Sequence, residues 1–384
     1  MERKKLGFGF MRLPLLAAND QKSINIEELK KMVDLFIDKG FSYFDLAYVY
    51  HQGFCEKAFH ETVVKRYPRD KYVVATKMPI GMLKSQDQQE QIFAEQLEKC
   101  GVEYFDYYLL HSITAGTFPI AKNMNSFEFA RQKKKAGKIR QIGFSFHDTP
   151  ELLETILTEN PDVDFVQLQI NYLDWDDITI QSGKCHQVAK SHGKDIVIME
   201  PVKGGALANL PEEVRDILKE HQPSLSAASW AVRFAAGLDN VITVLSGMSN
   251  LAQVADNVSY MENFKPLTDG EKAIIKQVLS KINEMIKIPC TACRYCESHC
   301  EENIAIPEIF SLYNSLQHSV NKAMSIETWY YSLLCERKGK PSDCVKCRKC
   351  EENCPQHIQI PECLEEASGV FEANMKLWAQ ATES

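Results

Sequence analysis

The strongest constraint on the fold is a regular alternation, from residue 1 to about residue 265, of short apolar segments with longer amphipathic ones. This alternation is typical of repeated βα units around a parallel sheet. We expect strands at residues 6–10, 41–47, 72–78, 104–111, 139–145, 164–170, 195–200 and 241–247. Helical periodicity fills the gaps: Leu29, Val33 and Phe36, for example, share one face of the first expected helix. Eight such units predict an α/β fold of the (β/α)8 TIM-barrel type.

Polar side chains recur where these strands end. They are Asp45, Lys77, His111, Ser145 with His147, the segment from Gln167 to Asn171, and Glu200. The carboxyl ends of the strands form the catalytic rim of a (β/α)8 barrel. A doubly wound sheet, the alternative, would place a G-x-G-x-x-G turn between its first strand and helix. No such motif opens a helix in this sequence, which favours the barrel.

Beyond residue 265 the chain changes character, because eight of its 13 cysteines fall in two runs with the same C-x2-C-x2-C-x3-C spacing. This is the ligand pattern of bacterial ferredoxins with two 4Fe-4S clusters, in which the fourth cysteine of each run binds the other cluster. By that rule one cluster takes Cys290, Cys293, Cys296 and Cys354, and the other takes Cys344, Cys347, Cys350 and Cys300.

Zinc and disulfides are weaker interpretations of the same cysteines. Zinc sites usually take two separated pairs of ligands, and tight clusters of cysteines do not suggest a disulfide framework. About forty mostly helical residues separate the two runs, more than a small ferredoxin needs. The arrangement resembles the helical two-cluster ferredoxin domains of respiratory and methanogenic oxidoreductases. We therefore expect a mainly α-helical ferredoxin-like domain after the barrel.

Charge and hydropathy exclude other classes of protein. The net charge is −8, and the short basic run at 133–135 suits a solvated helix face, so we expect no nucleic-acid partner. The amino terminus lacks an apolar run of signal-peptide length, and the chain lacks eighteen consecutive apolar residues. These features predict a cytoplasmic protein without a membrane partner.

Four motifs in the barrel half, FDLAYVY at 44–50, ATKMP at 75–79, LLHS at 109–112 and IRQIGFS at 139–145, resemble the aldo-keto reductase family. The resemblance extends from Leu6 to about Asn257. It implies a catalytic tetrad of Asp45, Tyr50, Lys77 and His111. In that chemistry Tyr50 protonates the oxygen of a carbonyl reduced by hydride, and Lys77 lowers the pKa of Tyr50. Asp45 would orient Lys77, and His111 would donate a hydrogen bond to the carbonyl oxygen.

The same resemblance implies a nicotinamide cofactor. Ser145 and Gln167 match the residues that hold the carboxamide. The adenosine-phosphate loop and helix of the family match Ser246, Gly247, Met248, Gln253 and Asn257. Gln253 stands where family members often have an arginine for the 2′-phosphate, so both NADP(H) and NAD(H) stay open.

These interpretations divide the chain into a barrel at residues 1–267 and an iron-sulfur domain at residues 268–384. The leading hypothesis is an NAD(P)H-dependent oxidoreductase that acts on a small carbonyl or alcohol, with clusters that exchange electrons with a redox partner protein. A flavin would join hydride to single-electron chemistry; we see no flavin motif, but the sequence leaves a flavin open. Two alternatives remain: clusters that are only structural or redox-sensing, and a non-catalytic electron-transfer or sensing subunit.

Overall fold

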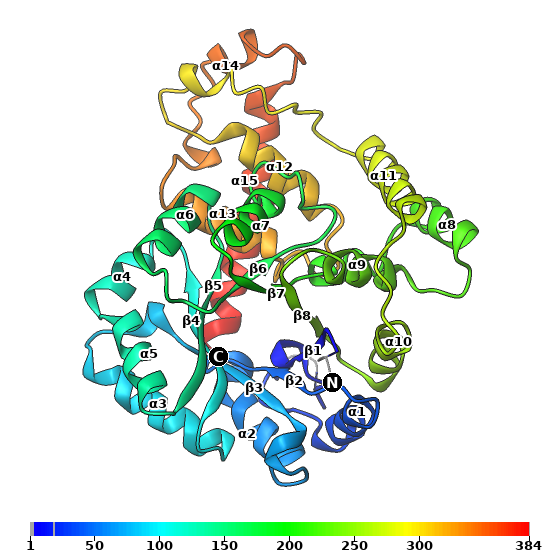
Figure 1. Ribbon diagram of the computed structural model, residues 1–384. Coiled ribbons are helices and arrows are strands. Elements are labelled where there is room, and N and C mark those ends of the chain that lie inside the picture. The colour runs from blue at the N-terminus through cyan, green and yellow to red at the C-terminus, as the bar shows by residue number, and fades with distance from the viewer. Residues whose placement is uncertain (1–3, 18–19, 384) are drawn as a thin grey trace. The chain divides into compact units, whose positions relative to one another are not determined.

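The computed structural model describes residues 4–17 and 20–383 and contains the predicted barrel (Figure 1). Its strands are β1 (Leu6–Gly9), β2 (Tyr43–Asp45), β3 (Val73–Met78), β4 (Phe105–Ile113), β5 (Ile139–Phe146), β6 (Phe165–Gln169), β7 (Asp195–Met199) and β8 (Val241–Gly247). Each strand pairs in parallel with the next, and β8 pairs with β1, which closes the barrel. All eight predicted strands are confirmed, with ends that differ by a few residues.

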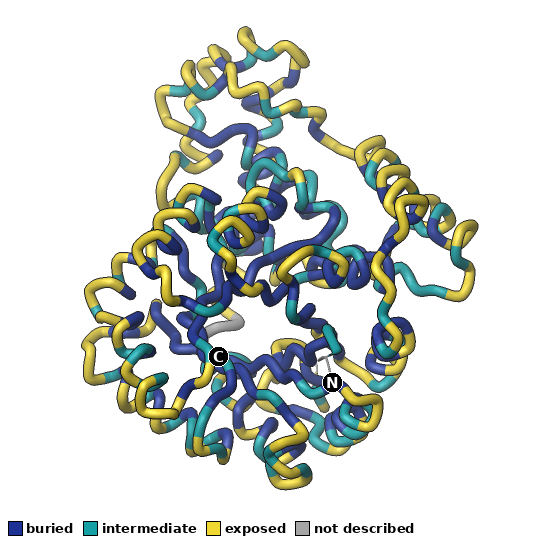
Figure 2. Tube along the Cα trace, in the orientation of Figure 1, coloured by how far each residue is buried: buried dark blue, intermediate teal, exposed yellow. Residues whose placement is uncertain are grey.

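The barrel interior is filled by side chains from alternate positions of the strands. Six buried residues form one cluster there: Tyr43, Ala75, Leu109, Phe165, Val197 and Leu245. On β5 the matching position is Gly143, because a side chain at this point would collide with the ring of Phe165. Buried residues, dark blue in Figure 2, follow the barrel strands accordingly. Since side chains alternate along a strand, residues two positions further on also face the interior.

Helices follow the strands and bury one face each. They are α1 (Ile26–Asp38), α2 (Cys55–Phe59), α3 (Asp87–Cys100), α4 (Phe118–Asn123), α5 (Ser126–Lys135), α6 (Pro150–Glu159), α7 (Ser182–Ser191), α9 (Ala227–Ala236) and α10 (Leu251–Met261). Two of them begin at predictable caps: the side chain of Asn25 accepts a hydrogen bond from Glu28 N, and that of Thr149 accepts one from Leu152 N.

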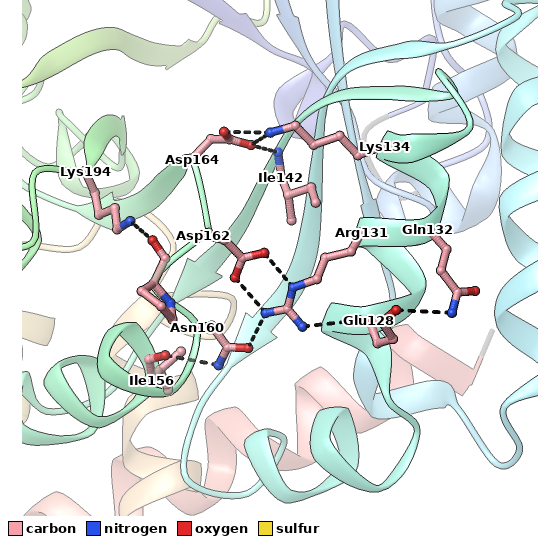
Figure 3. A network of polar contacts seen from close by, with 11 residues as sticks. Glu128, Arg131, Gln132, Lys134, Ile142, Ile156, Asn160, Asp162, Asp164 and Lys194 are labelled. Carbon is pink, nitrogen blue, oxygen red and sulfur yellow. Dashed lines mark hydrogen bonds and ion pairs between the residues drawn. The ribbon is translucent and has the colours of Figure 1, made fainter.

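A polar network fastens helix α5 to the amino-terminal ends of the neighbouring strands (Figure 3). Arg131 makes two hydrogen bonds to the carboxylate of Asp162, at 2.6 and 2.8 Å, in the bidentate geometry that strengthens such pairs. Lys134 binds Asp164, which also accepts a hydrogen bond from Ile142 N at 2.7 Å. This end of the barrel lies opposite the catalytic rim, so we assign the network to stability.

The chain forms two compact units. The first contains the described residues up to Trp175 together with 180–201 and 228–268; the second contains 176–179, 202–227 and everything from Asp269 onward. The loops after β6 and β7 therefore contribute to the second unit. The division at 267/268 that the sequence suggested stays a prediction.

The second unit is mainly helical, as predicted. Its helices are α8 (Glu212–His221), α11 (Asp269–Glu284), α12 (Ile306–Leu316), α13 (Ile326–Cys335), α14 (Lys349–Glu352) and α15 (Ile360–Glu383). Aromatic side chains hold α12, α13 and α15 together: the rings of Tyr331 and Phe371 stack with centroids 4.4 Å apart, and Tyr313 meets Phe371 edge-on at 6.4 Å. Among the described residues, none of the helices in either unit combines the length and the apolar character needed to cross a membrane.

Candidate active site and cluster-binding loops

The candidate catalytic residues lie one layer beyond the buried cluster inside the barrel. Asp45, Lys77 and His111 stand two residues after Tyr43, Ala75 and Leu109 on strands β2, β3 and β4, so all three face the interior at its carboxyl end. The Lys77 ammonium donates to Asp45 Oδ2 at 2.6 Å and to the carbonyl of Leu46 at 2.6 Å. Both charged side chains are buried, which makes this a desolvated ion pair.

Tyr50 completes the group from the 3-10 turn Tyr50–Gly53 that follows β2. The Lys77 Nζ atom lies 4.9 Å from the centre of its ring. The ring of His111 meets it nearly perpendicularly, with centroids 5.8 Å apart. The structure thus brings together the four side chains that the sequence analysis assigned to catalysis.

Burial and neighbouring charges together determine the pKa values of these side chains. Burial disfavours the ammonium of Lys77, but attraction to Asp45 and Tyr50 outweighs this and raises its pKa. Burial raises the pKa of Tyr50 to about 12, and Lys77 opposes that rise without cancelling it. Lys77 therefore lowers the pKa of Tyr50 as expected, but burial raises this pKa by more. Burial, followed by the charge of Lys77, lowers the pKa of His111 well below its usual value, so His111 is neutral near pH 7.

A second imidazole, His147, belongs to the same layer, although the sequence analysis gave it no role. It stands two residues after Ser145, and burial together with the charge of Lys77 lowers its pKa to about 3. Its backbone N–H donates to Ile113 O at 3.2 Å. The next residue, Asp148, accepts a hydrogen bond from Ala115 N at 2.8 Å. The sequence analysis named His147 at the end of the fifth strand, and the alternation of inward positions along β5 is the signal that would have given it a place beside the tetrad.

A buried polar network that the sequence analysis missed supports the backbone of Lys77. The Gln96 amide donates to the Lys77 carbonyl at 3.0 Å and to Glu56 Oε1 at 2.8 Å. Thr76 donates to the same Glu56 oxygen at 2.7 Å, and Tyr108 donates to Gln96 Oε1 at 2.6 Å. Burial raises the pKa of Glu56. These contacts hold the backbone of β3 in place at Lys77. They join residues of different helices and strands, so no sequence pattern predicts them.

The residues proposed to hold a nicotinamide lie side by side on β5 and β6. Ser145 pairs with Gln167 in the sheet register, and both are buried. Ser145 Oγ accepts a hydrogen bond from Ser112 N at 2.8 Å. The Gln167 amide nitrogen lies 3.5 Å from the sulfur of Met199, and its buried Oε1 atom has no hydrogen-bond partner among the described residues. Because buried polar atoms are nearly always hydrogen-bonded, this oxygen fits a carboxamide N–H of a bound cofactor.

The residues proposed for the adenosine-phosphate part lie at the end of β8 and the start of α10. Ser246 and Gly247 end β8, and Met248 is fully buried. The side chain of Gln253 is bonded within its own loop, because its oxygen accepts a hydrogen bond from Ser249 N at 2.7 Å. Asn257 Nδ2 donates to the Gln253 carbonyl at 2.9 Å.

A cation missed by the sequence analysis lies against the same loop. The exposed Arg12 packs on Gly247 so closely that a Cβ atom there would lie 2.9 Å from Arg12 Cγ. The carbonyl of Arg12 accepts a hydrogen bond from Ser249 Oγ at 2.9 Å. The side-chain stem of Arg12 therefore lies against the loop that lacks an arginine of its own.

The cysteine runs lie in the second unit. One cavity is lined by Cys290, Cys293 and Cys296 of the first run and by Cys354, the last cysteine of the second. The rest of the lining is mainly apolar, from Ile306, Pro307, Phe310, Ile358 and Ile360, and is completed by Thr291, Arg294 and Gln356. Soft thiolates around an apolar cavity suit an iron-sulfur cluster. The residues present therefore fit the group that the spacing implied.

The remaining four cysteines also lie near one another. Cys350 is buried, and burial is the main reason that its pKa is raised to about 11. The negative charges that Cys344, Cys300 and Cys347 can carry raise it further. Within the described residues, no three Cys, His, Asp or Glu side chains are arranged to hold a single metal ion.

Two family profiles match the chain. The profile of the Aldo/keto reductase family matches residues 5–280, and that of a 4Fe-4S dicluster domain matches residues 289–359. Among curated proteins, an aldo-keto reductase from Mycobacterium avium is 26% identical over 283 residues, which cover 68% of this chain and 92% of that protein. One from Mycolicibacterium paratuberculosis is 29% identical over 217 residues, 54% of this chain and 70% of that protein.

Solved structures show the same barrel. An aldo-keto reductase from Bacillus halodurans in its holo form superposes with a TM-score of 0.55 at 25% identity, covering 71% of this chain and 91% of that one. An aldo-keto reductase from Klebsiella pneumoniae in complex with NADPH superposes with a TM-score of 0.55 at 17% identity, covering 73% and 96%. The second likeness establishes the fold alone.

Proposed function

The chain belongs to the aldo/keto reductase family and carries a 4Fe-4S dicluster domain, and from this premise we propose that it is an NAD(P)H-dependent oxidoreductase. It reduces a small carbonyl compound, or oxidises the corresponding alcohol, by hydride transfer. Two 4Fe-4S clusters in the second unit exchange electrons with a partner protein. We place the enzyme in the cytoplasm, a reducing compartment that suits thiolate-bound clusters.

The observation that carries the proposal is the contact of Lys77 with both Asp45 and Tyr50 beside His111. A bound NADPH or NADH would supply the hydride. Tyr50 donates a proton to the carbonyl oxygen, and the charge of Lys77 stabilises the phenolate that remains. Asp45 holds Lys77 in place, and the neutral His111 donates a hydrogen bond to the same oxygen.

The remaining barrel residues have binding roles in this proposal. Ser145 and Gln167 hold the carboxamide, and the loop from Ser246 to Met248 with the start of α10 holds the adenosine phosphates. Arg12 supplies the positive charge for a 2′-phosphate, which favours NADP(H) over NAD(H). The relative from Klebsiella pneumoniae was solved with NADPH, which agrees with this choice.

The clusters would be held by the two cysteine sets, each with three thiolates from one run and one from the other. A cluster takes electrons singly, whereas hydride carries two, so two clusters in one unit match the electron count of one hydride. A structural or sensing role is the second candidate, because one cysteine of each run, Cys296 and Cys350, is buried in the unit, where a bound metal could stabilise the fold.

The test is carbonyl reduction by the full-length protein, purified without oxygen and assayed by NADPH oxidation at 340 nm against a panel of aldehydes and ketones. We expect turnover, and we expect Tyr50→Phe to lower kcat by about 10²- to 10⁴-fold while NADPH still binds. Tyr48→Phe, on a neighbouring tyrosine that bonds Glu95 at 2.9 Å, is the control. Equal activity of Tyr50→Phe and wild type would refute the proposed acid.

A further inference from the structure

The iron-sulfur unit contains a repeat that extends beyond the cysteines, with an offset of 54 residues. Every cysteine of the first run has its counterpart 54 positions later, and so do the I-x-I-P-E segments at 304–308 and 358–362. The backbone repeats as well. Three pairs of equivalent residues have positive φ angles: Ala292 and Lys346, Arg294 and Arg348, Asn303 and His357. The two loops therefore share one conformation.

In each copy, the arginine between the second and third cysteines forms ion pairs with two glutamates. In the first copy, Arg294 binds Glu297 at 2.7 Å and also binds Glu308, in the first turn of α12. In the second copy, the equivalent Arg348 binds Glu351 at 2.8 Å and also binds Glu362, in the first turn of α15.

This contact has a mechanical and an electrostatic consequence. Each arginine occupies a left-handed backbone conformation, which is unfavourable for a residue other than glycine. The bonds to two glutamates hold it there, so they fasten the cysteine loop to the helix that follows. Arg294 also lines the cavity formed by Cys290, Cys293, Cys296 and Cys354, so this arginine and its ion pairs belong to the wall of the proposed cluster site.

We propose that Arg294 and Arg348 are positioning residues that clamp each cysteine loop to its helix and set the reduction potential of the adjacent cluster. A cluster with four thiolates is negative and becomes more so on reduction, so a nearby cation favours the reduced form and a nearby carboxylate disfavours it. The first clamp acts more strongly than the second. Its outer carboxylate, Glu308, is 13% exposed, whereas Glu362 is 45% exposed and better screened by water.

The test is a redox titration of the full-length, anaerobically purified protein followed by electron paramagnetic resonance. Arg294→Gln should lower the midpoint potential of one cluster, and Glu308→Gln should raise it. Each shift should correspond to a three- to tenfold change in the reduction equilibrium, at most about 59 mV for one electron. Arg348→Gln and Glu362→Gln should move the other cluster in the same directions by less.

Opposite signs separate this proposal from a purely structural contact, because both substitutions in a pair break the same hydrogen bond. Arg294→Lys is the conservative variant: it keeps the charge but not the forked geometry. It should retain the wild-type potential and lose iron faster in air. Shifts of the same sign for Arg294→Gln and Glu308→Gln, equal shifts of both clusters, or no shift would overturn the proposal. The readout does not depend on the proposed carbonyl reduction.

Discussion

At the scale of single residues, the candidate site is built around the buried ammonium of Lys77, which bonds Asp45 and lies over the ring of Tyr50. Spacing and resemblance selected Asp45, Tyr50, Lys77 and His111, and the structure brings them together. The raised pKa of Tyr50 was not foreseen, because it depends on burial by distant parts of the chain. Arg12 was missed for the same reason: it lies more than 200 residues from Gly247 in sequence.

The pKa of Tyr50, about 12, predicts different pH profiles for the two directions of the reaction. Carbonyl reduction needs the protonated phenol, which persists below the pKa, so its rate should stay flat from about pH 6 to 10. Alcohol oxidation needs the phenolate, so its rate should rise about tenfold per pH unit over the same range. Steady-state assays in both directions measure this; a reduction rate that falls with a midpoint near pH 8 would contradict it.

Arg12 should determine the choice between the two nicotinamides. Arg12→Ala should raise the KM for NADPH by about tenfold, consistent with loss of a charge-assisted hydrogen bond to a phosphate, and leave the KM for NADH within twofold. Lys22→Ala, which removes another exposed cation from the same half of the chain, is the control. Equal changes for NADPH and NADH would show that Arg12 does not contact the 2′-phosphate.

At the scale of elements, the strands were predictable because each is a local apolar run, whereas their support was not. Nothing in the pattern of helix α3 reveals that Gln96 reaches the Lys77 carbonyl. The membership of residues 176–179 and 202–227 in the second unit likewise depends on contacts distant in sequence. The cysteine runs were predictable because their ligand chemistry dictates a fixed local spacing.

Gln96→Leu tests the support of strand β3. The substitution removes the donor to Lys77 O and Glu56 and the acceptor of the Tyr108 hydroxyl, so we expect a loss of about 2–3 kcal/mol in the free energy of unfolding. It should lower kcat more than it changes KM for the carbonyl substrate. Urea denaturation and steady-state kinetics measure both. Gln91→Leu, on an exposed residue of the same helix, should change neither.

The exchange of ligands between the two cysteine runs is testable by pairing substitutions. Cys354→Ser and Cys290→Ser should damage the same cluster, and Cys300→Ser should damage the other one, because each fourth cysteine serves the opposite run. Iron analysis should find about four of eight irons retained with an unperturbed spectrum for the remaining cluster. If Cys354→Ser instead matched Cys344→Ser, each run would hold its own cluster.

At the scale of the whole molecule, the proposed hydride site and the proposed electron-transfer site belong to one chain. The family profiles match residues 5–280 and 289–359, the two parts of the chain to which we assign the proposed functions. The loops after β6 and β7, whose strands carry Gln167 and Met199, form part of the unit that contains the cysteines. Covalent continuity therefore links the strands of the proposed nicotinamide site to the unit that contains the cysteine runs.

The most direct test of this union is the electron paramagnetic resonance signal of the clusters after anaerobic mixing with nicotinamide. NADPH is added to the oxidised protein, and NADP⁺ to the reduced protein, so that an unfavourable potential in one direction does not conceal transfer. The account predicts that the signal appears in the first experiment or decays in the second, with one nicotinamide converted for every two cluster electrons. Loaded clusters that respond in neither direction, in a protein that reduces carbonyls with NADPH, would contradict the coupling and leave the clusters a structural or sensing role.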